Sequence, residues 1–312
     1  MQTTNHVLMV RPARFAYNEQ TATNNAFQQK SEEGEDAVAQ EALREFDAFV
    51  ALLRDNGVTV DVVQDTPEPP TPDSIFPNNC FSTHSLTPVP SPEGEGSTLV
   101  LYPMYAPNRR LEREKLKKVF RHLHYSRDVD FTPYEMSGHF LEGTGSLVLD
   151  REHRMAYACL SPRTDEKALE EWAKTMGYRY FAFHSEDEQG TPVYHTNVVM
   201  HVGTRQAVVC LDSIRDESER NELLSRLQGN DKEVVPITLE QMHQFAGNML
   251  ELHNDRGEQL LIMSQTARQS LTPEQTATLS KYTRILSPDI HTIETAGGGS
   301  ARCMLAELSP LS

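Results

Sequence analysis

The sequence predicts an α/β protein folded as one domain over residues 1–312. Short runs rich in valine, leucine and tyrosine recur along the chain, and segments with helical periodicity lie between them. Several apolar runs follow one another with no helix between them, unlike the regular alternation of a doubly wound parallel sheet. A chain of 312 residues is also long enough to bury a full hydrophobic core.

The predicted strands are short apolar segments bounded by polar or turn-forming residues. Each is rich in residues that favour extended backbone and is shorter than a typical helix. Cys159 and Cys210 lie inside two of these runs, where we expect them to be inert buried residues. In chain order the predicted strands cover residues 6–12, 58–64, 97–104, 145–150, 154–161, 179–184, 198–203, 207–212, 233–238 and 260–265.

The predicted helices are segments with helical spacing of apolar residues or with recognisable ends. Segment 36–56 stops before Gly57, which can adopt the left-handed conformation of a C-terminal cap. Segment 272–282 opens with Thr272 as N-cap, followed by Pro273 at the first helical position. The remaining predicted helices cover residues 109–122, 164–176, 217–227, 239–250 and a C-terminal stretch from residue 300.

Composition and charge exclude several classes of function. No apolar run approaches the length of a membrane span, and the N-terminal segment lacks the basic region and apolar core of a signal peptide. The net charge of −16 is spread along the chain, so we expect no nucleic-acid partner. Four cysteines without CxxC spacing argue against a disulfide framework and a zinc site. We therefore expect a cytoplasmic protein with a small-molecule substrate, and the sequence leaves a homodimer open.

Four short stretches place polar residues beside glycine or proline turns. Residues 72–79 read PDSIFPNN, and Glu142 precedes a Gly-x-Gly turn in LEGTGSLVLD. His195 and Asn197 precede an apolar run in YHTNVVMHVG, and three consecutive glycines precede Cys303 in AGGGSARCM. Each has an ordinary explanation: turn-forming asparagines, a solvated carboxylate, a structural histidine, and a buried cysteine in a loop before a final helix.

Together, these stretches supply the parts of a cysteine nucleophile site. Cysteine attacks as a thiolate, which a nearby histidine or a helix N-terminus favours. Cys303 lies at the start of the predicted final helix, and the glycines before it permit close approach of the backbone. Sites also tend to form on loops beside strand ends, where all four stretches are expected. We therefore favour Cys303 as a nucleophile.

The four motifs, in this order, resemble those of the pentein superfamily of guanidine-modifying enzymes. This superfamily includes arginine deiminases, dimethylarginine dimethylaminohydrolases, succinylarginine dihydrolases and amidinotransferases. PDSIFPNN is similar to Asp-Ser-Val-Phe-x-Glu-Asp, LEGTG to a (Glu/Asp)-Gly-Gly-Asp turn, HTN to His-x-Asp and ARCM to Arg-Cys-Met. The resemblance covers the whole chain. It implies a five-bladed α/β propeller with pseudo-fivefold symmetry, a central site, and no metal or organic cofactor.

The resemblance also implies roles for individual residues. Cys303, His195 and Glu142 match the catalytic positions of the superfamily. Gly145 and three asparagines stand where the superfamily has acids, and for the two candidate arginines a solvated charge at a helix end is an equally good explanation. The candidate substrate-binding residues are Asp73, Asn78, Asn79, Arg109 (or its neighbour Arg110), Arg163 and Asn197.

The neutral amides in this set indicate the substrate. A guanidinium is a cation that pairs best with several carboxylates, whereas an amide can both donate to and accept from a neutral ureido group. Within the superfamily the chain looks most like amidinotransferase-like proteins that include citrulline-utilising hydrolases. We therefore predict hydrolysis of citrulline to ornithine, ammonia and carbon dioxide through a covalent Cys303 intermediate. Arginine deimination, dimethylarginine hydrolysis, amidino transfer and a non-catalytic binding scaffold stay open as alternatives.

Overall fold

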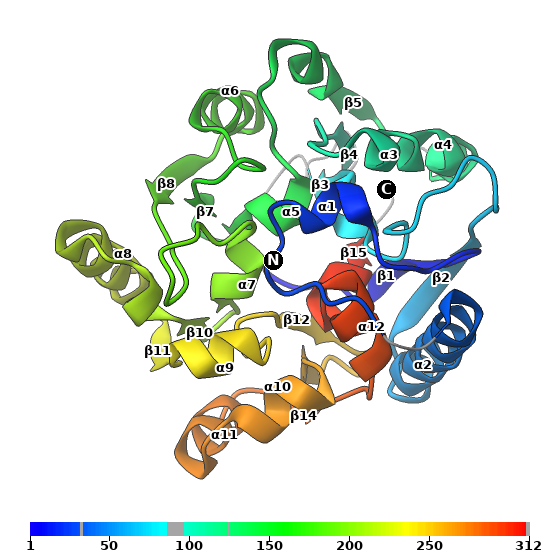
Figure 1. The fold of residues 1–312 in the computed structure, drawn as a ribbon. Coiled ribbons are helices and arrows are strands. Elements are labelled where there is room, and N and C mark those ends of the chain that lie inside the picture. Colours follow the sequence, from blue (N-terminus) through cyan, green and yellow to red (C-terminus); the bar gives the residue numbers. More distant parts are fainter. Residues whose placement is uncertain (32–33, 86–96, 124, 310–312) are drawn as a thin grey trace.

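The computed structural model describes residues 1–31, 34–85, 97–123 and 125–309. Within these ranges the strands form five three-stranded sheets. The sheets lie around a common centre, and the longer helices lie on the outside (Figure 1). The α/β class predicted from the sequence is thereby confirmed.

Each sheet repeats one strand arrangement, with an antiparallel edge strand, a middle strand and a parallel edge strand. In that order the sheets are β15 (Ala306–Glu307), β1 (His6–Arg11) and β2 (Thr59–Gln64); β3 (Phe81–Ser85), β4 (Ser97–Leu101) and β5 (Arg127–Asp130); β6 (Val148–Asp150), β7 (Met155–Cys159) and β8 (Arg179–Phe183); β9 (Met200–Val202), β10 (Gln206–Val209) and β11 (Glu233–Pro236); and β12 (Leu250–His253), β13 (Gln259–Ile262) and β14 (Arg284–Leu286).

Helices connect the parallel strands and cover the sheets. Parallel neighbours need a crossover connection, and the longer helices supply it. The α-helices are α1 (Glu19–Ala22), α2 (Glu35–Asp55), α3 (Pro107–Arg110), α4 (Glu112–His122), α5 (Gly143–Ser146), α6 (Glu166–Met176), α7 (Thr196–Val199), α8 (Glu217–Gly229), α9 (Leu239–His243), α10 (Gln265–Ser270), α11 (Pro273–Ser280) and α12 (His291–Gly297). Single 3₁₀ turns are η1 (Pro77–Asn79), η2 (Thr132–Ser137), η3 (Leu211–Ser213) and η4 (Ala301–Met304).

The antiparallel edge strands form the inner ring of the molecule. β6 contacts β9, β9 contacts β12, and β15 contacts β3, so these strands meet their counterparts in neighbouring sheets. Helices α2, α4, α6, α8 and α11 lie at the periphery (Figure 1). None of the helices in the described ranges is long and apolar enough to cross a membrane.

The helix–sheet interfaces hold the outer core. Trp172 of α6 is fully buried, packs in one cluster with Ala156 and Ala158 of β7, and donates from Nε1 to the hydroxyl of Tyr102 at 3.0 Å. A tryptophan at this interface fills the space between helix and sheet and also satisfies its polar atom.

The predicted helix 239–250 is wrong in its second half. α9 covers only its first five residues, and β12 begins at Leu250. Phe245 has φ 59°, which a helix cannot accommodate, and a Cβ added to Gly247 would lie 2.2 Å from the backbone oxygen of Val198. These residues form a turn that brings the start of β12 against α7.

The predicted C-terminal helix is also wrong. The chain from residue 300 forms the single turn η4 and then strand β15, which pairs antiparallel with β1. The backbone N–H of Leu308 donates to the carbonyl of His6 at 2.9 Å. Strand pairing with the N-terminal segment therefore prevails over the local helical pattern.

Smaller differences concern the bounds of single elements and a few elements that the sequence analysis did not predict. The predicted helix 109–122 is divided into α3 and α4, and the predicted strands 145–150 and 198–203 each begin with a short helical turn, α5 and α7. Strands β3 and β5 were missed because their sequences, FSTHS and RDVD, are polar and are held extended by pairing with β4. Strands β12, β14 and β15 and helix α12 were missed as well.

We expect Trp172→Ala to lower the free energy of unfolding by about 3–5 kcal/mol, because it opens a cavity between α6 and the sheet. Urea denaturation measures this change. Met136→Ala is the matched control, since Met136 is 93% exposed and should change stability by less than about 0.5 kcal/mol. A loss below about 1 kcal/mol for Trp172→Ala would contradict the packing described here.

Candidate active site

Five short turns meet at the centre of the fold, each just before an antiparallel edge strand. They are η1 before β3, α5 before β6, α7 before β9, residues 244–249 before β12, and η4 before β15. α5 contacts both η1 and α7, and η1 contacts η4. Figure 1 shows α5, α7 and α12 near the middle of the ring. The repeated architecture thus gathers five separate turns into one place.

The thiol of Cys303, in η4, receives two amide hydrogen bonds. Nδ2 of Asn197 lies 3.4 Å from Sγ, and Nδ2 of Asn248 lies 3.3 Å from it. Oδ1 of Asn248 also lies 3.7 Å from Sγ, where it accepts from the thiol. The two sides of the sulfur are therefore lined by neutral donors from α7 and from the turn before β12.

The other cysteines have a different environment. Burial raises the pKa of Cys80 and of Cys159 to about 12, and that of Cys210 to about 11. All three lie in the hydrophobic core, as the sequence predicts for Cys159 and Cys210. Cys303 also packs in a hydrophobic cluster, but its sulfur receives the amide N–H groups of Asn197 and Asn248.

His195 is the N-cap residue of α7 and pairs with Glu142. Its Nε2 lies 2.8 Å from Oε2 of Glu142. A carboxylate only accepts hydrogen bonds, so the neutral imidazole carries its proton on Nε2 and keeps Nδ1 as an acceptor. Burial lowers the pKa of His195 to about 4, against the opposing effect of Glu142. At neutral pH His195 is therefore an uncharged base.

Glu142 is a fully buried carboxylate with a complete set of partners. Burial alone would raise its pKa, but Arg163, the hydrogen bond from His195 and the charge of Arg109 lower it to about 2. Its Oε1 accepts from the backbone N–H of Tyr105 at 2.9 Å, and Nη1 of Arg163 lies 3.6 Å from Oε2. Glu142 is thus ionised and fixes the orientation of the histidine.

Gly145 explains one departure from the superfamily pattern. A Cβ at this position would lie 2.4 Å from Oδ1 of Asn79 and 2.8 Å from Nδ1 of His195. An acidic side chain here would displace both groups. In this chain the backbone of α5 approaches the histidine directly.

The three asparagines contribute amide atoms that have no partner among the described residues. Both side-chain polar atoms of Asn78, Oδ1 of Asn79 and Oδ1 of Asn197 are buried and unpaired. Unpaired buried polar atoms are costly, and in a native site they indicate where a ligand would bind. They offer acceptors together with a donor.

Asp73 and Arg109 lie together beneath η1. Oδ2 of Asp73 accepts from Asn18 at 2.9 Å, while its Oδ1 has no partner among the described residues. Burial raises the pKa of Asp73. The guanidinium of Arg109 makes a bidentate pair with Glu112, at 2.8 and 3.1 Å, and also donates to the carbonyl of Phe76. Asp73 thus has an oxygen available, whereas Arg109 is engaged by the protein.

Arg163 links the site to the N-terminal segment. Its Nε and Nη2 donate to Oδ1 of Asn24, and Nη2 also donates to the carbonyl of Thr21 at 2.8 Å. The guanidinium stacks on the ring of Tyr194 at 4.9 Å. Arg163 therefore lies beside Glu142 but already has partners for most of its donors.

Sequence reasoning missed Asn248 and Arg302. Asn248 lies in the turn before β12, the position in the repeat that corresponds to the other site turns. Recognising the fivefold repeat would have drawn attention to it; no local motif marks it. Arg302 belongs to the ARCM motif but was not given a role.

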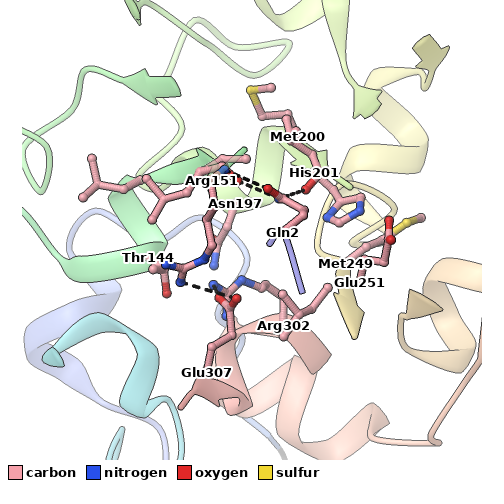
Figure 2. A pocket seen from close by; sticks show the side chains of 15 residues that line it. Gln2, Thr144, Arg151, Asn197, Met200, His201, Met249, Glu251, Arg302 and Glu307 are labelled. Carbon is pink, nitrogen blue, oxygen red and sulfur yellow. Dashed lines mark hydrogen bonds and ion pairs between the residues drawn. The ribbon is translucent and has the colours of Figure 1, made fainter. Parts of the chain in front are cut away.

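A small buried cavity lies under the site (Figure 2). Its volume of about 30 Å³ is far below the roughly 300–1,000 Å³ of typical ligand pockets, so it does not hold an amino acid. Glu307 bridges two arginines there, 3.0 Å from Nη2 of Arg302 and 3.4 Å from Nη2 of Arg151. Asn197 lines the cavity and also contacts Cys303. The turn that carries the thiol therefore rests on a buried ion-pair network.

Within the described ranges no group of three or more histidine, cysteine or acidic side chains could hold a metal ion.

One family model matches most of the chain. The model of the family described as eukaryotic N,N dimethylarginine dimethylhydrolase matches residues 11–309. No curated protein sequence matches the chain.

Solved structures share the fold at low sequence identity. The apo structure of ArgZ, an arginine dihydrolase from the ornithine–ammonia cycle in cyanobacteria, has a TM-score of 0.72 and 15% identity over 96% of this chain. This chain spans 40% of that one, but 96% of the separate N-terminal domain of ArgZ, solved with substrate at a TM-score of 0.71 and 15% identity. A dimethylarginine dimethylaminohydrolase adduct with S-methyl-L-thiocitrulline has a TM-score of 0.64 and 16% identity, covering 98% of this chain and 99% of that one.

We expect the buried histidines to oppose stability as pH falls below 6.5. Burial lowers the pKa of His195 to about 4 and of His201 to about 3, and burial likewise lowers that of His84. These histidines take up protons near pH 6.5 in the unfolded chain but not in the folded one, so His195 and His201 should each cost about 2 kcal/mol between pH 7 and 5. Burial raises the pKa of Glu112 to about 7, and this carboxyl acts in the opposite direction over the same range. Urea denaturation at several pH values measures the slope.

His201→Gln should reduce that loss by about 2 kcal/mol, because it removes one of the proton-binding groups of the unfolded chain. His122→Gln is the control, since His122 is exposed. A pH dependence in His201→Gln as steep as in the unmodified protein would show that His201 is not buried in its neutral form.

Proposed function

The chain belongs to the N,N-dimethylarginine dimethylhydrolase family of the pentein superfamily, and from this premise we propose that it is a cysteine hydrolase of a ureido or guanidino amino acid. Enzymes of this family hydrolyse C–N bonds that are not peptide bonds. The observation that carries the proposal is the polar surroundings of Cys303, whose sulfur accepts from two amides beside the His195–Glu142 pair.

The first half of the reaction forms a covalent intermediate. The thiol of Cys303 gives its proton to Nδ1 of His195, and the thiolate attacks the central carbon of the substrate. The resulting imidazolium is stabilised by Glu142, which already holds Nε2. The C–N bond to the terminal nitrogen then breaks, and His195 returns the proton to the departing ammonia.

The second half consumes water. With citrulline the intermediate is an S-carbamoyl cysteine. His195, neutral again, takes a proton from a water molecule that attacks the same carbon, and the C–S bond breaks to regenerate the thiol. The product is a carbamate of ornithine, which decays to ornithine and carbon dioxide. Glu142 keeps the histidine in the tautomer that both halves need.

Citrulline is the substrate that we propose. The unpaired atoms of Asn78, Asn79 and Asn197 offer both hydrogen-bond acceptors and a donor without adding charge. The carboxylate of Glu142 is committed to His195, Arg163 and Tyr105. A neutral ureido group fits this lining better than a cation, which would be left poorly paired. The free Oδ1 of Asp73 is the proposed partner of the substrate's α-ammonium group.

A second candidate is stepwise hydrolysis of arginine. ArgZ, whose N-terminal domain has the same fold and was solved with substrate, is an arginine dihydrolase. Amides could accept from a guanidinium in a first round and bind the ureido product in a second. Dimethylarginine hydrolysis, amidino transfer to an amine, and a non-catalytic scaffold are further outcomes that the assays below separate.

We also propose that residues 1–312 form one propeller-shaped domain with the sheets as its five blades. Two observations support this: every sheet has the same strand arrangement, and β15 from the C-terminal end joins β1 from the N-terminal end. The proposed site lies where the five blades meet.

Cys303→Ala and His195→Ala should each lower kcat by at least about 10²-fold, because proton transfer alone contributes roughly 10²–10⁴. Ammonia and ornithine release measure the loss. Cys210→Ala is the matched control, since that cysteine lies in the core away from the site. Retained turnover in the Cys303 variant, with the fold intact by circular dichroism, would refute the proposal.

Citrulline should have a higher kcat/KM than arginine or methylarginines in a panel assayed for ammonia and ornithine. Asn79→Asp and Asn197→Asp should shift the ratio toward arginine, because each adds a carboxylate that pairs with a guanidinium. The ratio is read with and without an added amine, so that amidino transfer is detected. A preference for arginine in the unmodified enzyme would favour the second candidate, and an unchanged ratio in both variants would show that these asparagines do not choose the substrate.

A further inference from the structure

Asn248 is fully buried, and both polar atoms of its side-chain amide hydrogen-bond with η4, the turn that carries Cys303. Its Nδ2 donates to Sγ of Cys303 at 3.3 Å and to the carbonyl of Asn197 at 2.9 Å. Its Oδ1 accepts from the backbone N–H of Arg302 at 3.0 Å and also lies 3.7 Å from Sγ as an acceptor for the thiol. One side chain thus binds the reacting sulfur, the residue before it and the neighbouring α7 turn.

We propose that Asn248 is a catalytic residue that fixes the direction of Sγ of Cys303 and donates to the thiolate that forms once His195 has taken the thiol proton. This inference rests on the proposed function, in which Cys303 is the nucleophile. It gives a role to the turn before β12, where none of the sequence motifs lies.

The backbone of that turn is shaped to deliver the amide. Phe245 adopts φ 59°, an uncommon conformation for a bulky residue, and the N–H of Asn248 donates to the carbonyl of Phe245 at 2.8 Å. Gly247 lies against α7, where an added Cβ would meet the carbonyl of Val198 at 2.2 Å. Backbone strain of this kind persists where the surrounding structure fixes it, often at functional sites.

Asn248 and Asn197 both donate to the sulfur of Cys303 but differ in the partners of their side-chain oxygens. Asn197 donates to Cys303 but leaves Oδ1 unpaired, so it can also bind substrate. Asn248 has no side-chain atom left unpaired and is therefore committed to the enzyme itself. The two N–H groups approach the same sulfur atom from different turns.

Neutral donors are needed here because the histidine is uncharged. Burial lowers the pKa of His195 to about 4, so the imidazolium exists only after His195 has taken the thiol proton, whereas the amide donors are in place before that step. Hydrogen bonds to the charged form favour it, and donors fixed before reaction require no reorganisation.

The turn is also held from below, which keeps the sulfur in line with these donors. Figure 2 shows Arg302 reaching toward Glu307, with Arg151 on the other side of the carboxylate. Nη1 of Arg302 donates to the carbonyl of Leu305 at 2.7 Å and closes η4. Asn248 therefore acts on a turn whose other end is anchored.

The test measures the alkylation rate of Cys303 by iodoacetamide between pH 6 and 9.5, by mass spectrometry of the peptide that contains it. Cys303→Ala confirms the assignment. Asn248→Asp keeps an acceptor for the Arg302 N–H but replaces the donor to sulfur with a carboxylate oxygen. We expect the midpoint of the rate profile to move up by at least one pH unit, a tenfold slower reaction at pH 7.

Asn248→Ala separates this role from a structural one. The Ala variant removes the contact with the Arg302 N–H as well as the donor to sulfur. If Asn248 only held the turn in place, Asn248→Ala would therefore slow the alkylation of Cys303 strongly and Asn248→Asp only slightly. We expect Asn248→Asp to move the midpoint of the rate profile further than Asn248→Ala does, because only Asp adds a negative charge beside the sulfur. Asn254→Asp is the matched control, a buried asparagine that hydrogen-bonds in the turn after β12 without contacting Cys303.

The inference is overturned if Asn248→Asp folds and its midpoint stays within about 0.3 pH units of that of the unmodified protein, which is about a twofold change in rate. If Asp does not fold, an unmoved profile in Asn248→Ala does the same. On citrulline, kcat of Asn248→Asp should fall about 10²-fold with KM nearly unchanged. A shifted profile without turnover of any panel substrate would refute the proposed function but not the role of Asn248. Turnover with an unmoved profile would refute the role of Asn248 but not the proposed function.

Discussion

The central constraint on this structure is the buried carboxylate of Glu142. A charge without water must be matched by protein donors, and here the donors come from three separate parts of the chain. His195 binds it from α7, Tyr105 from the segment before α3, and Arg163 from the loop before α6. Arg163 in turn holds the N-terminal segment through Asn24. Satisfying one carboxylate therefore orients the histidine and closes the chain around the site.

Around this satisfied charge lies a set of atoms that the protein leaves unsatisfied. The amides of Asn78, Asn79 and Asn197 and one oxygen of Asp73 are buried with unpaired atoms. Each such atom lowers the stability of the free protein unless a ligand binds it. Asn248 differs from them, because both polar atoms of its amide are paired within the protein.

The repeat of the fold explains why these residues meet. Antiparallel edge strands of neighbouring sheets contact one another, and the turns that precede them are in contact as well. A polar residue placed a few positions before such a strand reaches the site from any of the five sheets. Small residues are needed where the turns approach most closely, as at Gly145 beside His195.

The sequence by itself determined the α/β class, most of the middle strands and the longer helices, because apolar periodicity and caps such as Thr272 act locally. It also pointed to Cys303, His195 and Glu142 through short motifs. Only the tertiary structure decided that residues after 300 form a strand, that helix α9 ends early, and that Asn248 reaches the sulfur. These features depend on pairing and contacts between segments distant in the chain, such as β15 with β1, and local preferences cannot encode them.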